Sequence, residues 1–268
     1  MLVVTLGDLL LDVVVRLEES LAPGDDANAA TRLGGGGQAA NVAAWAAALG
    51  ADARCVVRRG DDAPGGWLAA ELAAYRVELA GPVAGRNGVV VSLVAPGGER
   101  TMASDRGTAT ALEPDDLDPS WFACDCLHIS GYSLVATPID DAAVRAAQLA
   151  HAAGAQVSVD LSASTRIRSF GAARFREKLG AVAPQIVFGN EAEWDELGDV
   201  AATCVVKRGA GGFDVVRGDE VRRCQARDVP VVDTTGAGDA LAAGFLVGGA
   251  ELAAEAAARC VAQVGAMP

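Results

Sequence analysis

The segment VVDTTGAGDA, residues 231–240, runs directly into an apolar stretch that predicts a helix over residues 237–248. Small residues just before a helix leave its first backbone N–H groups open at the positive end of the helix dipole, which is a ready anion site. Asp239 stands in that first turn. An acid there often only complements the dipole. Beside an anion site, it can instead accept the proton of a hydroxyl that attacks a phosphoryl group.

A second glycine cluster, GGGGQAAN at residues 34–41, leads into a helix predicted over residues 39–49. Glycine permits positive φ and close backbone approach, and Asn41 can both donate to and accept from hydroxyls. Taken alone, this cluster is equally typical of a flexible turn before a helix. Gly7 and Asp8 end the first predicted strand, and Asp12 follows four residues after Asp8. A carboxylate there suits a sugar diol, although a solvated loop acid is the commoner occurrence.

Strands and helices alternate along most of the chain. This order favours an α/β fold, with a largely parallel sheet covered on both faces and a ligand crevice beyond the carboxyl ends of its strands. The predicted strands are residues 2–6, 53–57, 126–129, 156–160, 186–189 and 203–207, and the helices between them are residues 39–49, 66–74, 139–153, 172–179 and 192–197.

Two regions break the alternation. Residues 12–17 and 30–33, and residues 87–94 and 100–104, form strand pairs with no helix between them. We expect a small antiparallel sheet inserted into the main domain, either as a lid over a site or as an immobile meander at the sheet edge. Towards the end of the chain, residues 213–217 and 221–224 predict a hairpin, and helices are predicted over residues 237–248 and 252–264.

Length and composition narrow the function classes. The 268 residues suit one large domain, and 35 acidic against 22 basic residues give a net charge of −13. That charge disfavours binding to nucleic acid or to an anionic membrane. No Gly-Lys pair exists for a Walker loop, and the dinucleotide fingerprint fails at Leu241. Residues 1–4 begin as a strand without a basic leader, and six cysteines lack a C-x-x-C pair, so a cytoplasmic protein with reduced thiols is expected.

Four segments together resemble the ribokinase-like (PfkB-type) family of carbohydrate kinases. DTTGAGD (residues 233–239) looks like its carboxyl-terminal signature and GGQAAN (residues 36–41) like its amino-terminal one. GNEAE (residues 189–193) is similar to its N-x-x-E motif, and KRGAGG (residues 207–212) to its nucleotide-contacting strand and turn. The resemblance implies one three-layer α/β/α domain over residues 1–268, with lid strands inserted from about 12–33 and 87–104.

The resemblance also implies ATP-dependent phosphorylation of a primary hydroxyl on a sugar or sugar-like molecule. Asp239 would be the base, with the amides of Gly236, Ala237 and Gly238 as the anion hole. Mg²⁺ would be held through water by Asn190 and Glu193, and a monovalent cation such as K⁺ by Asp233, Thr235 and the Gly265 region. The nucleotide would contact Asn190, Lys207, Gly209 and Gly212, and the acceptor would contact Asp12, Gly36, Gly37 and Asn41.

Some positions depart from the family pattern. Ser130-Gly131 stands where ribokinase carries a glutamate, and Asp160-Leu161-Ser162 lacks the D-x-N-x-R pattern of fructokinase-like members. Arg106 is a candidate contact for an acidic or phosphorylated acceptor, or else a solvated loop arginine. A nucleoside kinase of the same fold is the alternative, and a silent sugar- or nucleotide-binding regulator is disfavoured because the signature residues are intact. Exposed valines in the lid strands predict a homodimer formed through the lid.

Overall fold

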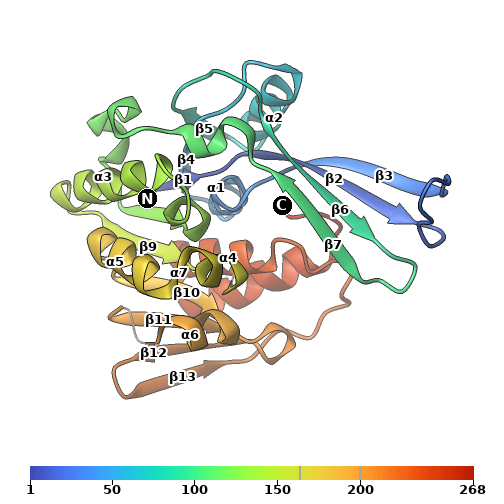
Figure 1. The fold of residues 1–268 in the computed structure, drawn as a ribbon. Helices are drawn as coiled ribbons and strands as arrows, with labels where there is room; N and C mark the ends of the chain where they lie inside the picture. The colour runs from blue at the N-terminus through green and yellow to red at the C-terminus, as the bar shows by residue number, and fades with distance from the viewer. Residues whose placement is uncertain (163, 199–200) are drawn as a thin grey trace.

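The computed structural model describes residues 1–162, 164–198 and 201–268. Within this part of the chain, the main sheet has nine strands in the order β13-β12-β11-β10-β9-β8-β1-β4-β5. Neighbours from β5 to β11 pair in parallel, and β12 and β13 add an antiparallel edge hairpin (Figure 1). The strands are β1 (Leu2–Gly7), β4 (Asp52–Val57), β5 (Val77–Ala80), β8 (Cys126–Ser130), β9 (Gln156–Asp160), β10 (Ile186–Asn190), β11 (Thr203–Lys207), β12 (Phe213–Arg217) and β13 (Glu220–Cys224).

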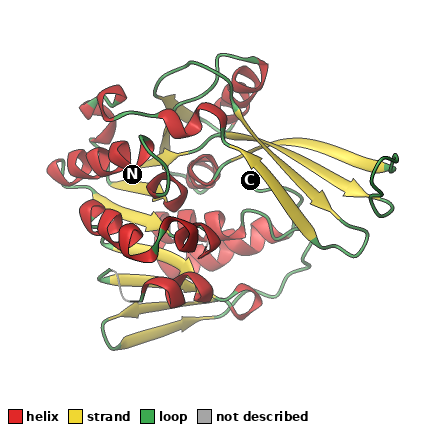
Figure 2. Ribbon diagram, in the orientation of Figure 1, coloured by secondary structure: helices red, strands yellow, loops and turns green. Residues whose placement is uncertain are grey.

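Helices cover both faces of this sheet (Figure 2). Val3 and Val4, adjacent on β1, belong to different hydrophobic clusters because successive strand side chains point to opposite faces. Such two-sided burial explains why the parallel strands read as continuous apolar runs. On one face lie α1 (Gln38–Ala48), α2 (Ala63–Ala74) and α7 (Ala237–Val261), and on the other lie α3 (Ile139–Ala152), α4 (Ser164–Phe170), α5 (Ala172–Val182) and α6 (Glu191–Leu197). The three-layer α/β/α prediction is confirmed.

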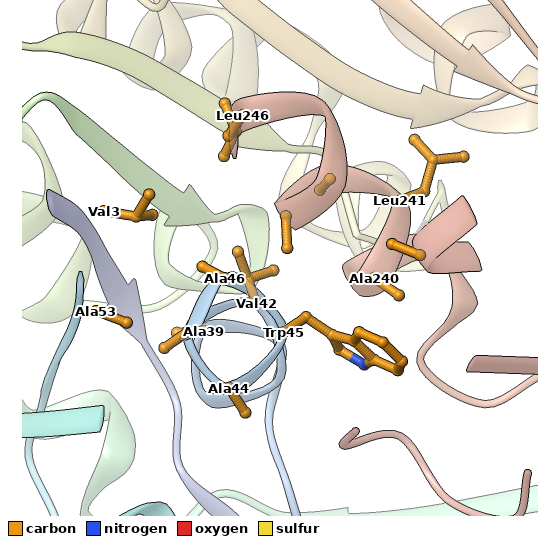
Figure 3. Packing of buried hydrophobic residues seen from close by; sticks show 14 of the residues in the cluster. Val3, Ala39, Val42, Ala44, Trp45, Ala46, Ala53, Ala240, Leu241 and Leu246 are labelled. Carbon is orange, nitrogen blue, oxygen red and sulfur yellow. The ribbon is translucent and has the colours of Figure 1, made fainter. Parts of the chain in front are cut away.

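The two helices that follow the glycine-rich segments, α1 and α7, pack against each other. Figure 3 shows Val42 and Trp45 of α1 facing the part of α7 that carries Ala240 and Leu241. Alanines on both helices let the backbones approach closely. The Trp45 indole N–H also donates to the Ala266 carbonyl at 2.8 Å, which fastens the end of the chain to α1. This packing brings two signatures that are about 200 residues apart to one place.

By length and composition, α7 could cross a membrane, but half of its most apolar window is buried in the protein. Its packing in the core accounts for its apolar character. The two terminal helices expected from the sequence are joined in α7, whose backbone leaves helical geometry at Gly248 (φ −149°) and Gly249 (φ 76°).

A separate sheet projects from the main body (Figure 1). It contains β2 (Leu10–Leu17), β3 (Ala29–Gly36), β6 (Gly88–Val94) and β7 (Arg100–Asp105) in the order β3-β2-β6-β7, and we call it the lid sheet. Its strands span residues 10–36 and 88–105, where lid strands were expected at about 12–33 and 87–104. The expected antiparallel sheet was wrong in part. The central strands β2 and β6 pair in parallel because both run outward from the main body. The returning strands β3 and β7 pair antiparallel with β2 and β6, respectively.

Several elements differ from the sequence-based expectation. Helix α2 begins at Ala63, three residues early, because the Asp62 carboxylate caps it by accepting from the Gly65 N–H at 3.1 Å. Strand β5 and helix α4 were not predicted, since both are short. Short 3-10 helices occupy Gly107–Ala111, Pro114–Asp116, Pro119–Phe122, Gly131–Leu134 and Gly209–Gly211.

Candidate active site

Polar side chains gather where the parallel strands end. Asp8 follows β1, and Asp160, Asn190 and Lys207 are the last residues of β9, β10 and β11. Carboxyl ends of neighbouring parallel strands lie at one edge of the sheet, where α/β proteins bind ligands. Both glycine-rich helix starts belong to this edge, because Asn41 on α1 reaches Asp239 on α7.

Asp239 has a strongly altered acidity. Asn41 Nδ2 donates to its Oδ2 at 2.7 Å. Burial raises the pKa of Asp239 to about 7; the Asn41 hydrogen bond and Lys207 lower it, while the charges of Asp160 and Asp8 raise it. A carboxyl that ionises near neutral pH is suited to accept a proton from a hydroxyl.

The start of α7 requires glycine at position 236 and is closely approached at position 238. Gly236 has φ 77°, and a Cβ there would lie 2.6 Å from Ala266 Cα. A Cβ on Gly238 would lie 3.1 Å from Lys207 Nζ. The missing side chain therefore lets an ammonium group approach the first turn of α7, where the backbone N–H groups lack intrahelical acceptors. The Ala237 N–H donates to the Thr234 carbonyl at 3.3 Å, so this member of the expected anion hole is partly engaged.

Lys207 forms a buried ion pair that the sequence did not predict. Its Nζ lies 2.7 Å from Asp160 Oδ2 and 3.0 Å from Oδ1, and Asp160 is fully buried. Burial alone would lower the pKa of Lys207, but Asp160 and Glu193 outweigh it and the pKa is raised. The ammonium is therefore held in its charged form beside the start of α7. The sequence signals for Asp160 were its position at a strand end and its place in the segment compared with the D-x-N-x-R pattern.

Asn190 and Glu193 form a helix-capping box at the start of α6. The Glu193 N–H donates to Asn190 Oδ1 at 3.0 Å, while the Asn190 N–H and Nδ2 donate to the Glu193 carboxylate at 2.9 and 2.8 Å. Burial raises the pKa of Glu193, against the opposing charge of Lys207. No cluster of three or more acidic, cysteine or histidine side chains in the described residues could ligate a metal. The oxygen atoms of Asn190 and Glu193 fit a Mg²⁺ ion that keeps its bound waters and contacts the protein through them.

The amino-terminal cluster brings Asp12 against Gly36. A Cβ on Gly36 would overlap with the Asp12 carboxylate, and one on Gly37 (φ 98°) would overlap with the Asp8 carbonyl. Glycine at both positions therefore lets two chain segments meet. Burial raises the pKa of Asp12 to about 6, with Asp8 and Glu71 adding to the rise and Arg100 opposing it.

Arg106 is not a solvated loop side chain. Its Nη1 donates to Asp8 Oδ2 at 2.5 Å, and its Cζ lies 4.1 Å from the centroid of the Tyr132 ring. In the described residues, the other oxygen of Asp8 and the Oδ1 of Asn41 are buried without a hydrogen-bond partner. Two unmet acceptors beside Asp239 can receive hydroxyl donors from a bound molecule. Asp8 and Tyr132 were not predicted as site residues.

The two glycines Gly209 and Gly212 of the turn after β11 have different surroundings. Gly209 has φ 54°, and a Cβ there would meet no atom within 4 Å, so its surface is open. Gly212 has φ 85°, and a Cβ there would overlap with the Cys224 carbonyl. The hairpin itself therefore requires Gly212.

Asp233 and Thr235 do not fit the monovalent-cation site implied by the resemblance. Asp233 Oδ1 accepts from the Thr235 N–H at 3.0 Å and hydroxyl at 2.6 Å, and its Oδ2 accepts from the Gly265 N–H at 3.2 Å. Arg100 of the lid sheet adds a guanidinium, with Nη1 2.5 Å from Thr235 Oγ1 and Nη2 3.3 Å from Asp233 Oδ1. A positive charge and a full set of donors already surround the carboxylate.

Comparison with known proteins identifies the family. The family model described as pfkB family carbohydrate kinase matches residues 1–267. A protein named ATP-dependent ribose-1-phosphate kinase, from Halopiger xanaduensis, is 31% identical over 259 residues, covering 91% of this chain and 83% of its own. A fructokinase from Klebsiella pneumoniae is 31% identical over 238 residues, covering 80% of this chain and 76% of its own.

Solved structures share the whole fold. Adenosine kinase from Sinorhizobium meliloti superposes with a TM-score of 0.86 at 27% identity, over 99% of this chain and 95% of that one. A putative ribokinase II from E. coli, in complex with ATP and Mg²⁺, has a TM-score of 0.80 at 23% identity, over 99% and 94%. The matching family model, the two named kinases and the shared fold agree: the chain belongs to the pfkB family of carbohydrate kinases.

Proposed function

We propose that this protein transfers the γ-phosphoryl group of ATP to a primary hydroxyl of a sugar or sugar-like molecule, with Asp239 as the base. The observation that carries the proposal is the position of Asp239 in the first turn of α7, with its pKa raised to about 7 and Asn41 bonded to it at 2.7 Å. The family membership supports the reaction class.

In the proposed reaction, the acceptor hydroxyl gives its proton to the Asp239 carboxylate while its oxygen attacks the γ-phosphorus. The bond from that phosphorus to the bridging oxygen breaks, and ADP leaves. Negative charge that develops on the transferred group meets the N–H groups of Gly236, Ala237 and Gly238 and the nearby ammonium of Lys207. Asp160 positions that ammonium and keeps it charged.

The nucleotide would lie along the carboxyl ends of β10 and β11, near Asn190, Lys207, Gly209 and Gly212. Mg²⁺ would be held through water by Asn190 and Glu193, and when bound it neutralises phosphate charge. The open surface at Gly209 supports close approach of a ligand there. The hairpin requires glycine at position 212, so Gly212 would contribute to this site only by shaping the turn.

The acceptor would lie against Asp12, Gly36, Gly37 and Asn41, under the lid sheet. Carboxylates at Asp8 and Asp12 favour a neutral polyol, because they accept hydroxyl donors and repel phosphate. The Halopiger relative is named as a kinase of ribose-1-phosphate, which is a phosphorylated acceptor. If the acceptor of this chain is also phosphorylated, Arg106 is the candidate contact for its phosphate. Arg106 would then have to leave Asp8 or be shared with it, since the two are paired at 2.5 Å.

The base assignment is tested by Asp239→Asn. The amide keeps the shape but cannot take the proton, so kcat should fall on the order of 10²–10⁴-fold. ATP affinity, measured by calorimetry, should stay close to that of the wild type. The matched control is Glu251→Gln, which changes an exposed acid on the same helix and should leave turnover unchanged. Near-normal turnover by Asp239→Asn would show that another group accepts the proton.

The acceptor itself is found by thermal shift. A ligand that binds the native state raises the melting temperature. Neutral sugars, sugar phosphates and nucleosides are each tested with a non-hydrolysable ATP analogue and Mg²⁺. A shift with neutral sugars alone supports the polyol assignment, a shift with sugar phosphates alone points to Arg106, and a shift with nucleosides alone favours the nucleoside-kinase alternative.

A further inference from the structure

The lid sheet reaches the anion-hole loop through arginine side chains on its two edge strands. Arg100 on β7 donates to Thr235 at 2.5 Å and to Asp233 at 3.3 Å. Arg32 on β3 donates to the Val264 carbonyl at 2.6 Å. Asp233, Thr235 and Val264 belong to the two segments that meet at the start of α7, because the Gly265 N–H also bonds Asp233. Both edge strands of the lid sheet therefore place a positive charge where these two segments meet.

The carboxylate at this junction is nearly buried. The Asp233 side chain is 8% exposed, while that of Arg100 is 29% exposed. Burial would raise the pKa of Asp233, but the hydrogen bonds from Thr235 and Gly265 and the charge of Arg100 outweigh it, and the pKa is lowered. Hydrogen bonds to a carboxylate and a positive charge beside it both favour its ionised form. In this chain, the positive charge beside Asp233 is the Arg100 guanidinium.

We propose that Arg100 takes the place of a monovalent cation, so that contact with the lid sheet, rather than K⁺, holds the anion-hole loop in position. A metal ion next to Asp233 would have to displace the guanidinium or share one carboxylate with a second positive charge. Because Arg100 stands on a lid strand and Asp233 leads into α7, the same contact joins the lid sheet to the catalytic helix start. Arg100 is thus a positioning residue that acts through Asp233 and Thr235.

The test compares KCl, NaCl and tetramethylammonium chloride at constant ionic strength, in the full chain. For the wild type, the melting temperature and kcat/KM should be the same in all three salts, within about twofold for kcat/KM. Arg100→Ala should lose about tenfold or more of kcat/KM in tetramethylammonium chloride, because the loop that carries the anion hole loses its cation. K⁺ should restore part of this loss and raise the melting temperature of the variant by about 2 °C or more.

Two further variants make the result specific. Arg86→Ala removes an arginine just before lid strand β6 whose partner is Asp105 at the end of β7, with the two side chains 59% and 60% exposed, and it should respond to no salt. Arg100→Lys keeps a fixed charge and should remain independent of K⁺. If Arg100→Ala does not fold, the wild-type salt series and Arg100→Lys still decide the matter.

The inference rests on the proposed function only in its kinetic measurement. The melting temperatures need no acceptor and no turnover, so they hold even if the proposed reaction is wrong. Specific stabilisation of the wild type by K⁺ would overturn the inference, and so would an Arg100→Ala variant that behaves like the wild type in every salt.

Discussion

At the scale of single residues, the chemistry depends on how neighbours alter acidity. Asp239 and Lys207 lie in the same crevice, yet the pKa of both is raised, by different causes. Burial dominates for Asp239, whereas for Lys207 the charges of Asp160 and Glu193 outweigh burial. The result is a carboxyl that ionises near neutral pH beside an ammonium that stays charged.

This acidity predicts a pH profile. The proposed reaction needs Asp239 deprotonated, so kcat/KM should fall as the pH drops below about 7. Asn41 lowers the pKa of Asp239 by its hydrogen bond. Asn41→Ala should therefore move the acid limb of the profile to higher pH, besides reducing kcat/KM at every pH.

The measurement is the difference in acid limb between the variant and the wild type at the same ATP and Mg²⁺ concentrations, because titration of ATP affects both enzymes equally. Asn28→Ala, an exposed asparagine bonded to Glu19, serves as control and should not move the limb. A limb that moves to lower pH in Asn41→Ala would contradict the role given to this hydrogen bond.

At the scale of elements, strand β2 joins the proposed acceptor region to the lid sheet. Its Asp12 is packed against Gly36 of β3. The charges of Asp8 and Glu71 raise the pKa of Asp12, and that of Arg100 lowers it. One strand thus places a carboxylate between the proposed acceptor region and the lid contact to α7.

Removing that carboxylate should harm acceptor use and spare ATP. Asp12→Ala leaves an acceptor hydroxyl without its partner, which costs about 1–3 kcal/mol, or roughly 5- to 150-fold in kcat/KM for the acceptor. ATP affinity should change little, because Asp12 stands on β2 of the lid sheet, whereas the proposed nucleotide contacts Lys207 and Gly209 lie at and just after the end of β11 in the main sheet. The control, Arg16→Ala, changes an exposed side chain further along the same strand. Unchanged acceptor kinetics in Asp12→Ala would remove this residue from the site.

At the scale of the whole molecule, the lid sheet leaves an apolar row uncovered. The strand register sets Val13 opposite Leu33 on one side and Val91 on the other, so the three share one face. Leu33 is 58% exposed. Strand edges and apolar faces of this kind are usually covered in solution.

We therefore expect a homodimer through the lid sheet, measured as twice the chain mass by light scattering at micromolar concentration. Leu33→Asp should shift the mass towards the monomer, because it places a charge in the apolar row. Val221→Asp is the matched control: Val221 is also 58% exposed, on edge strand β13, and its replacement should leave the dimer intact. A wild-type monomer under these conditions would rule out the dimer.

Much of the fold and part of the site follow from local sequence patterns. Apolar runs alternating with alanine-rich stretches predicted the covered parallel sheet, because burial on both faces needs continuous apolar strands. The small residues before α7 and α1 marked both helix starts, since local backbone geometry depends on local side chains. Asp239 and Asn41 were singled out in this way, whereas Asn190 and Glu193 were named only through the family resemblance, and the structure shows that they form a capping box.

The tertiary structure alone decided which charges meet. Arg100 pairs with Asp233, Arg106 with Asp8 and Lys207 with Asp160, across 133, 98 and 47 positions of the sequence. The parallel pairing of β2 with β6 is of the same kind. A local pattern records whether a segment is apolar, helical or turning. Which strand ends become neighbours depends on the packing of the whole chain, and the strength of each ion pair depends on the burial that this packing creates.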